Sequence, residues 1–141
     1  MLGGIHIPWE YGLEGHSDAD VLLHAVTDAL LGALALDDIG QWFPNTDPAW
    51  RNAASSDFLK TVLRSPQFTG WEVVNLDALI MAEKPKLAPH RQQIRESLAG
   101  LLGVPLDRVS VKAGTQEGLD AIGRGEGMAA QATVLLYHHS T

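Results

Sequence analysis

The stretch GHSDADVLLHAVTDALLG, residues 15–32, mixes a helical apolar pattern with ionisable side chains. Its apolar residues recur at helical spacing, and Asp18 or Asp20 is placed to cap the start, so we predict a helix here. Asp20, His24 and Asp28 follow at intervals of four residues and share one face of that helix. The spacing alone leaves two interpretations open. The face is either a solvated surface stripe, which the spacing slightly favours, or a site where an imidazole and carboxylates bind a metal or an anion.

The remaining segments predict an α+β fold made of one domain, residues 1–141. Alternation and turn residues give the order strand, helix, helix, strand, helix, strand, strand. The predicted strands are 3–8, 71–83, 108–114 and 128–138, and the predicted helices are 20–36, one that Ser55 or Ser56 caps, and 89–102, which Gly103 ends. These strands would form one four-stranded, mainly antiparallel or mixed sheet with the helices on one face. The strand at 71–83 is apolar on both alternations, with Val74, Leu76, Ala78 and Ile80 on one side, so we expect other subunits to cover the second face.

Composition excludes several classes of protein. A net charge of −7 argues against sequence-independent binding to nucleic acid and against docking on anionic membranes. The absence of cysteine excludes disulfides, thiolate metal sites and cysteine nucleophiles. No segment has the roughly 18 consecutive apolar residues of a membrane span, and no secretory signal is visible. The chain starts as if in the middle of a strand, so we expect a further segment upstream.

Three polar loops add candidate chemistry. The loop at 37–48 is long and polar, the loop at 82–90 carries two lysines that suit phosphate, and the segment 112–127 is rich in glycine. In the last of these, the hydroxyl of Thr115 can donate a hydrogen bond, Glu117 can bind a divalent cation and Arg124 can bind phosphate. Each loop also fits a solvated turn without a ligand. No Walker loop, dinucleotide turn or nucleophile elbow is present. Together these features indicate metal-assisted chemistry on phosphates without a covalent nucleophile.

Residues 15–48, GHSDADVLLHAVTDALLGALALDDIGQWFPNTDP, closely resemble the 2-C-methyl-D-erythritol 2,4-cyclodiphosphate synthase family, and the resemblance continues through KPKLAPH, VSVKAGTQEGL and GRGEG. It implies a homotrimer whose three sheets surround a central axis, with active sites between neighbouring subunits. The implied reaction converts a cytidine diphosphate compound, 4-diphosphocytidyl-2-C-methyl-D-erythritol 2-phosphate, into the cyclic diphosphate and CMP. The implied location is a bacterial cytosol or a plastid.

The resemblance also implies roles for individual residues. His24 resembles a zinc ligand and Glu117 a magnesium or manganese ligand. His16 and Thr115 resemble transition-state stabilisers, and His16 and Ser17 resemble contacts for the substrate phosphates. The implied substrate contacts are Asp38, Ile39, Gly40, Phe43, Pro44, Asn45, Thr46 and Asp47 for the erythritol part, Ala82, Glu83, Lys84, Pro85, Lys86, Leu87 and Ala88 for cytidine, and Gly114, Thr115, Gln116, Glu117, Ala121 and Arg124 for the phosphates and the central cavity.

Several positions depart from the family pattern. The family's G-x-D-x-H motif, which supplies two further zinc ligands, would precede Met1, so we expect the three-ligand zinc site to be incomplete in this chain. Asn45 replaces the family's more usual aspartate, Asp120 replaces a glycine and Ala121 replaces a phenylalanine. The changes at Asp120 and Ala121 would alter a prenyl-binding cavity on the trimer axis. Two alternatives to the complete enzyme follow. One is a truncated or degenerate, non-catalytic trimeric paralogue that retains a cytidine pocket, and the other is a piece of a cytidylyltransferase–synthase fusion.

Overall fold

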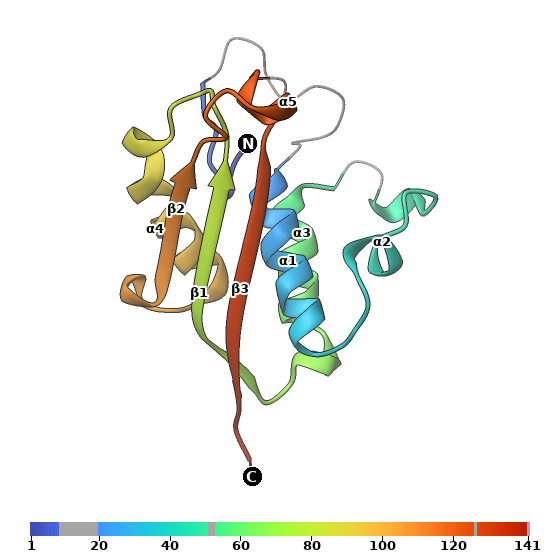
Figure 1. Cartoon of the computed structure of the whole chain (residues 1–141). Helices are drawn as coiled ribbons and strands as arrows, with labels where there is room; N and C mark the ends of the chain where they lie inside the picture. The colour runs from blue at the N-terminus through green and yellow to red at the C-terminus, as the bar shows by residue number, and fades with distance from the viewer. Residues whose placement is uncertain (9–19, 51–52, 126, 141) are drawn as a thin grey trace.

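The structure, a computed structural model, describes residues 1–8, 20–50, 53–125 and 127–140. Figure 1 shows a twisted sheet with helices behind it. The elements in chain order are α1 (Val21–Ala33), α2 (Ile39–Trp42), α3 (Ser55–Leu63), β1 (Trp71–Met81), α4 (Arg91–Leu102), β2 (Val109–Gly114), α5 (Asp120–Gly123) and β3 (Ala129–His138). Single 3₁₀ turns lie at Pro48–Trp50, Pro66–Phe68, Ala88–His90 and Leu106–Arg108.

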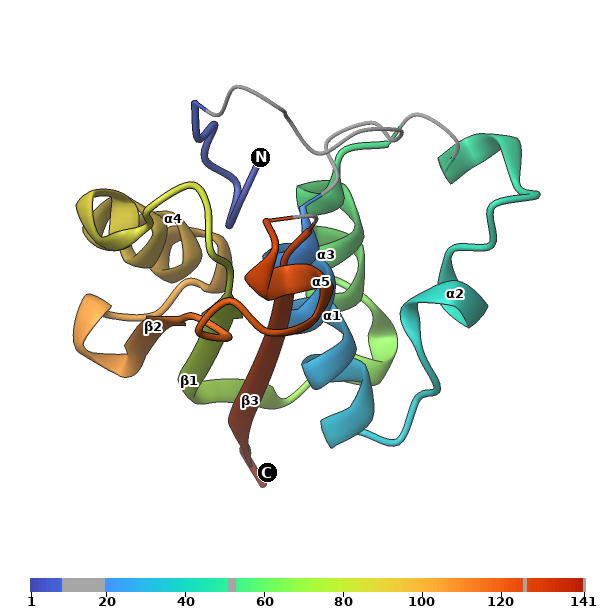
Figure 2. The same ribbon diagram turned by 45° about the horizontal axis from the view of Figure 1, so that its top comes forward.

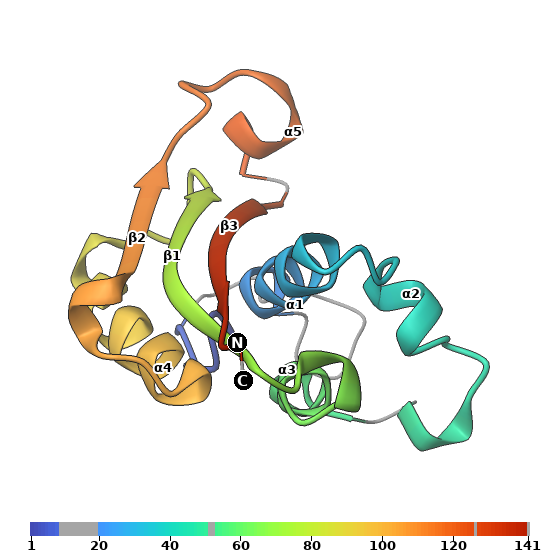
Figure 3. The same cartoon turned by 90° about the horizontal axis from the view of Figure 1, so that it is seen from below.

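The sheet has the strand order β2-β1-β3. The central strand β1 pairs parallel with β2 and antiparallel with β3, so that Leu76 lies opposite Val109 on one side and Val134 on the other. Helices α1, α3 and α4 all cover the same face, while α2 lies on the far side of α1, away from the sheet (Figure 3). The predicted α+β class, the mixed sheet and the placement of helices on one face are therefore confirmed.

Helix α1 supplies a large part of the core. Leu22, Leu23, Val26 and Leu30 are all buried, as their helical spacing predicts. The side chain of Asp20 caps the helix by accepting the N–H of Leu23, which confirms one of the two predicted caps. The helix ends at Ala33, before the predicted end, and Ala35 and Asp37 beyond it have φ values of +56° and +72°, which a helix does not continue through.

Helix α4 matches its prediction closely at the C-terminal end. It ends at Gly103, whose φ of 69° is the left-handed conformation that glycine adopts without strain. At the N-terminal end, the predicted first helical residues form the 3₁₀ turn Ala88–His90 instead. The two predictions differ in quality because a C-terminal glycine is a specific signal, whereas a proline can begin either kind of turn.

The predicted strand at residues 3–8 was wrong. Gly3 and Gly4 have φ values of +62° and +85°, and the described N-terminal segment contains only a bridge between Leu2 and Ile5. A side chain on Gly3 would also place its Cβ 2.8 Å from Cγ2 of Ile94. Successive residues with positive φ cannot extend a strand, so the described residues form a sheet of three strands, where we predicted four.

A β-bulge changes which side chains of β1 face the helices. Val73 pairs with Leu136 and Asn75 with Leu135, which leaves Val74 as an extra residue. Val73 therefore shares the buried face with Leu76, and the prediction that placed Val74 there was wrong. On the other face of the sheet, Leu135 and Tyr137 are 57% and 55% exposed. Apolar side chains thus lie on both faces, as predicted, and trimer packing over the second face stays a prediction.

One end of the sheet gathers the segments that carry candidate chemistry. Strands β1 and β2 run parallel, so both end there, and β3 begins there. Figure 2 shows α5 lying across this end. Residues 82–88 follow β1 and residues 115–124 follow β2, so two of the predicted binding segments become neighbours through strand direction alone. Among the described helices, none combines the length and apolar character that a bilayer crossing requires.

Candidate functional site

His24 lies one turn into α1 and faces α3. Its Nε2 is 3.0 Å from Oγ of Ser55, a hydrogen-bond distance, and its ring centroid is 6.1 Å from that of Phe58. Ser55 is 1% exposed, whereas His24 is half-buried. This contact therefore fixes the imidazole between two helices and makes Ser55 the hydrogen-bond partner of Nε2. The predicted cap of α3 was wrong, because Ala54 occupies the cap position and Ser55 bonds to the histidine instead.

Asp20 explains part of the ionisable pattern that opens the sequence. It is 0% exposed, and its carboxylate accepts the backbone N–H groups of Gly3, Gly4 and Leu23 at 2.9, 2.8 and 2.9 Å. Hydrogen bonds to a charged acceptor are stronger than neutral ones, which offsets the cost of burying the carboxylate. The interpretation as a solvated stripe was therefore wrong for Asp20, which joins the N-terminal turn to the start of α1.

Asp28, eight residues further along α1, supports the next loop. Its Oδ1 accepts the N–H of Ile39 at 2.7 Å, and Oδ1 of Asp38 accepts the N–H of Gln41 at 2.9 Å. Two carboxylates thus fix the start of α2, which contains Gly40 of the predicted erythritol segment. Asp20 and Asp28 lie four residues before and after His24, and the carboxylates of both accept backbone N–H groups.

The loop after α2 is anchored by an aromatic cluster. Phe43 is 6% exposed, and its ring stacks on Phe58 at 4.6 Å between centroids and meets Trp50 edge-on at 4.8 Å. Asn45 and Thr46 are exposed, and Asp47 accepts the N–H of Ala49 at 2.9 Å. The buried ring of Phe43 anchors the loop, and the polar groups of the loop face outward. The half-buried Pro44 lies between the buried ring and the exposed polar residues.

The loops after β1 and β2 form a second group of predicted site residues. The N–H of Ala82 donates to the carbonyl of Gly114 at 3.0 Å. Oε1 of Glu83 accepts the N–H groups of Gln116 and Gly118 at 3.0 and 3.3 Å. Lys84, Lys86 and Ala88 are exposed, Pro85 is half-buried, and Leu87 is buried beneath them. The exposed hydroxyl of Thr115 accepts the N–H of Glu117 at 3.3 Å, and the Glu117 side chain is also exposed.

Helix α5 shows why one departure from the family pattern is tolerated. Asp120 has a φ of +57°, a conformation natural to glycine, the residue that the resemblance gives for this position. Aspartate tolerates this region better than most residues, because its short side chain can bond locally. Here Oδ1 accepts the N–H groups of Ile122 and Gly123 at 2.9 and 3.2 Å. The exposed side chains of Ala121 and Arg124 follow on this turn.

Among the described residues, no group of three or more histidine, cysteine, aspartate or glutamate side chains is placed to hold a metal ion. Structural and catalytic zinc sites use three or four protein ligands. The predicted zinc ligand His24 and the predicted magnesium or manganese ligand Glu117 lie in different parts of the fold, on α1 and in the loop after β2. The described part of the chain therefore does not form a complete metal centre. His16 and Ser17 lie outside the described residues.

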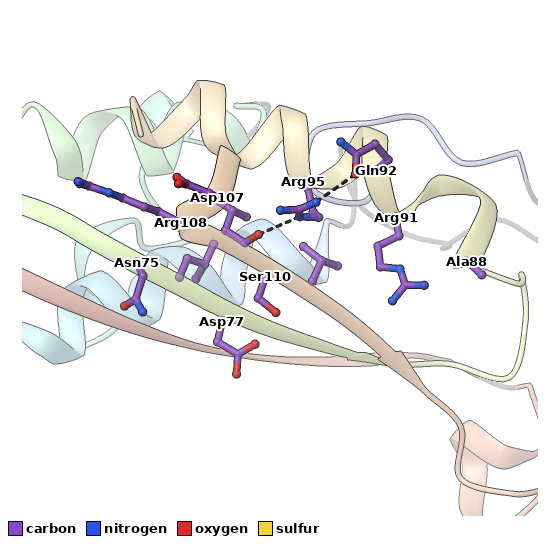
Figure 4. A pocket seen from close by; sticks show the side chains of 12 residues that line it. Asn75, Asp77, Ala88, Arg91, Gln92, Arg95, Asp107, Arg108 and Ser110 are labelled. Carbon is purple, nitrogen blue, oxygen red and sulfur yellow. Dashed lines mark hydrogen bonds between the residues drawn. The ribbon is translucent and has the colours of Figure 1, made fainter. Parts of the chain in front are cut away.

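A cleft of about 710 Å³ lies elsewhere, between α4 and the strands β1 and β2 (Figure 4). Of the predicted site residues that the structure describes, Ala88 alone lines this cleft. Nε and the two terminal nitrogens of Arg95 donate to the carbonyl of Val109, to Gln92 and to the carbonyl of Leu106, so this guanidinium ties α4 to the start of β2. On the strand side of the cleft, a hydrogen bond from Lys112 holds the pKa of Asp77 below its ordinary value. The cleft is thus separate from the predicted chemistry.

The structure thus places the predicted residues in two groups. His24 and the 38–47 loop lie around α1, α2 and α3, while the 82–88 and 114–124 segments lie at the end of the sheet (Figures 1 and 2). Sequence reasoning missed the role of Ser55, because 31 residues separate it from His24 and no short-range pattern links them. It also left Asp20 and Asp28 without firm roles, although their spacing around His24 was a usable signal.

Fold and site together define an α+β protein with helices on one face of a mixed sheet and two separate groups of polar loops suited to phosphate chemistry. The chain belongs to the YgbB family, whose model matches residues 1–137. It is 57% identical over 136 residues to the 2-C-methyl-D-erythritol 2,4-cyclodiphosphate synthase of Trichlorobacter lovleyi, covering 96% of this chain and 87% of that protein. It is 56% identical to the synthase of Gloeobacter violaceus over the same share of this chain and 83% of that one.

Solved structures agree with the sequence relatives. A 2C-methyl-D-erythritol-2,4-cyclodiphosphate synthase in a CDP-bound form matches with a TM-score of 0.89 and 40% identity over 97% of this chain and 89% of its own. The bifunctional IspDF of Campylobacter jejuni matches with a TM-score of 0.91 and 41% identity over 99% of this chain, which spans 38% of that longer chain. These findings confirm the predicted family and favour the enzyme over a non-catalytic paralogue.

Proposed function

We propose that this chain is a phosphorus–oxygen lyase of the non-mevalonate isoprenoid pathway. Its reaction converts 4-diphosphocytidyl-2-C-methyl-D-erythritol 2-phosphate into 2-C-methyl-D-erythritol 2,4-cyclodiphosphate and CMP. The observation that carries this proposal is the 57% identity to a synthase over 96% of the chain. The match to a CDP-bound synthase supports a cytidine nucleotide as the ligand.

The reaction is an intramolecular phosphoryl transfer. An oxygen of the substrate's 2-phosphate attacks the β-phosphorus, the bond from that phosphorus to the bridging oxygen of CMP breaks, and CMP leaves with the electron pair. The attacking group belongs to the substrate, so the protein needs no nucleophile. Catalysis rests on holding the reacting oxygen in line and on placing donors near the developing charge. We assign this stabilisation to Thr115, whose hydroxyl is exposed at the end of β2, and to His16.

The substrate contacts follow the two groups of loops. We propose that Asp38, Ile39 and Gly40, together with the 43–47 loop, hold the erythritol part. The ring of Phe43 is buried, so its part in this is to support the loop from within. We propose that the 82–88 segment reads cytosine through backbone groups, and that Ser17, Arg124 and the 114–117 segment contact phosphates.

We further propose that the protein is a homotrimer with its active sites between neighbouring subunits. The two groups of loops lie on different sides of one chain, with α2 beyond α1 and the other loops over the end of the sheet. A ring of identical subunits places one side of each chain against the other side of the next. The exposed Leu135 and Tyr137 on the open face of the sheet also suit burial in such an assembly.

Divalent metals are part of the proposal, but no step is derived through them. The donor chemistry fits, since an imidazole such as His24 suits zinc and a carboxylate such as Glu117 suits magnesium or manganese. The described residues supply one donor to each ion. Elemental analysis of the purified protein, prepared with and without a chelator, would show which metal it retains and in what ratio to the chain.

A direct test is to incubate the metal-supplemented protein with the diphosphocytidyl substrate and measure CMP and the cyclic diphosphate. The enzyme reading predicts that the two products form in equal amounts, and that Thr115→Ala lowers kcat by about 100-fold, as loss of one transition-state donor does elsewhere. Release of CMP without cyclic product would indicate hydrolysis. Binding of CMP without any turnover would instead support the non-catalytic paralogue.

A further inference from the structure

Glu83 lies two residues beyond the end of β1, in the segment assigned above to cytidine, but its carboxylate faces the neighbouring loop. Its Oε1 accepts the backbone N–H groups of both Gln116 and Gly118, at 3.0 and 3.3 Å. A single oxygen therefore receives two donors from a turn more than thirty residues away in the chain. The side chain is half-buried, which limits competition from water.

The turn that Glu83 holds is not one that the chain favours by itself. Glu117 and Gly118 have φ values of +52° and +79°, two successive left-handed residues, and the first of them carries a side chain. Such a conformation persists only where the surroundings fix it. It also points backbone N–H groups into one concavity, an arrangement that attracts an anion. Here the anion is the carboxylate of Glu83.

Two further contacts join the same two loops. The N–H of Ala82 donates to the carbonyl of Gly114 at 3.0 Å, and the side-chain amide of Gln116 donates to Sδ of Met81 at 3.5 Å. Both flank the turn at its start, and within the turn the N–H of Leu119 donates to the carbonyl of Gln116 at 2.9 Å. Among the described side-chain hydrogen bonds of the loop after β1, the one that Glu83 accepts reaches Gly118. The carboxylate thus anchors to the loop after β1 the turn that displays Thr115 and Glu117.

We propose that Glu83 is a positioning residue that holds the Thr115–Gly118 turn in its active shape, rather than a contact for the cytosine ring. The role rests on the proposed function, since it matters for catalysis through Thr115 and Glu117. Because two N–H groups share one acceptor, removal of the carboxylate releases both at once. The cytidine segment and the phosphate turn are thereby coupled as one rigid unit.

The test compares Glu83→Ala, which removes the acceptor, with Glu83→Gln, which keeps one acceptor oxygen without the charge. Glu96→Ala is the matched control, because Glu96 is exposed on α4 and receives only a 3.4 Å bond from Gln92 among the described contacts. Amide hydrogen exchange measured by NMR reports on the N–H groups of Gln116 and Gly118 directly, and steady-state kinetics of CMP release report on function. Thermal unfolding checks that each variant is folded.

In Glu83→Ala we expect the two amides to exchange at least about 10-fold faster, because their acceptor is gone, while the amides of α1 keep their protection. We expect kcat to fall by about 10- to 100-fold, the usual effect of losing a supporting hydrogen-bond partner, with KM changed by less than about threefold. Glu83→Gln should lose less than about fivefold in kcat, because a neutral acceptor is weaker but present. Glu96→Ala should match the wild type in every measurement.

Unchanged exchange of both amides in Glu83→Ala would overturn the proposal. So would a rise in KM at constant kcat, which would make Glu83 a direct substrate contact. If the wild-type protein shows no turnover, the proposed function fails on its own, and the exchange rates of Gln116 and Gly118 still decide whether Glu83 holds the turn. If Glu83→Ala folds poorly, Glu83→Gln takes its place in the test. In that variant, amide exchange at Gln116 and Gly118 equal to the wild type, combined with the large kcat loss expected for alanine, would refute the role.

Discussion

Replacement of Asp20 should show how much stability the ionisable pattern on α1 contributes. Its carboxylate is fully buried and, among the described contacts, accepts three backbone N–H groups, two at Oδ1 and one at Oδ2. Asp20→Ala removes the helix cap, worth about 1 kcal/mol, and leaves the N–H groups of Gly3 and Gly4 without this acceptor, at about 1–3 kcal/mol each. Alanine also removes the desolvation cost of the carboxylate, so we expect a net loss of about 3–5 kcal/mol.

Asp20→Asn is the sharper variant because it changes one oxygen only. The remaining amide oxygen can keep the bonds from Gly3 and Leu23, while the new NH₂ group faces the N–H of Gly4, donor against donor. We expect a loss of about 1–3 kcal/mol, the cost of one unsatisfied buried group.

Urea unfolding at pH 7 and one fixed protein concentration measures both losses, since association of subunits would otherwise shift the midpoint. With an m value of about 2 kcal/mol/M, Asp20→Ala should lower the midpoint by about 2 M, and Asp20→Asn by about half of that. Asp107→Asn, at an exposed aspartate in the α4 cleft, is the control and should leave the midpoint in place. Equal losses in the asparagine and alanine variants, or a loss under about 1 kcal/mol in alanine, would refute the role of Asp20 as the buried acceptor for the N–H groups of Gly3, Gly4 and Leu23.

Three further predictions follow from contacts in the structure. Ser55→Ala should free Nε2 of His24 and change the ¹⁵N shifts of that ring in NMR spectra, with about 1 kcal/mol lost in unfolding; unchanged ring shifts would contradict the assignment of Nε2 to Ser55. Phe43→Ala should cost about 3–5 kcal/mol in thermal unfolding by opening a cavity among stacked rings, and a cost below 1 kcal/mol would mean that the loop is not anchored there. The lowered pKa of Asp77 contributes stability that is present above its unfolded pKa near 3.8 and is lost as pH falls through the lower folded pKa. Lys112→Met should therefore flatten the plot of stability against pH below about pH 4. The change should be small, because both side chains of the pair are exposed.

The sequence predicted best the elements that local signals define. The apolar spacing of α1 and the glycine after α4 each specify a helix from nearby residues, and both predictions hold in the structure. The failures have long-range causes. The alternation of residues 3–8 is typical of a strand, but Gly3 and Gly4 turn there and donate to Asp20, sixteen or more residues away. A strand pattern read locally does not include such a partner.

The candidate site divides in the same way. Motif residues such as His24 and the 37–48 loop were evident from the sequence, because polar groups stood out in an apolar setting. Supporting residues were not, since Ser55 and Glu83 act on atoms that lie 31 and 33 or more residues away. The bulge at Val74 shows most simply what local patterns cannot predict. One extra residue moves Val73 onto the buried face, and no strand propensity indicates where a bulge occurs.

The packing of α1 across β3 has a consequence for synthesis of the chain. Helix α1 ends at Ala33, but the strand that covers it begins only at Ala129. At about 5–20 residues per second, the apolar stripe of α1 waits about 5–20 s on the ribosome for that cover. During this interval the nascent chain exposes Leu22, Val26 and Leu30, residues that are fully buried afterwards. Part of the apolar surface of the helix that carries His24 is therefore without its final cover for most of the synthesis of the chain, an interval in which a chaperone can bind it.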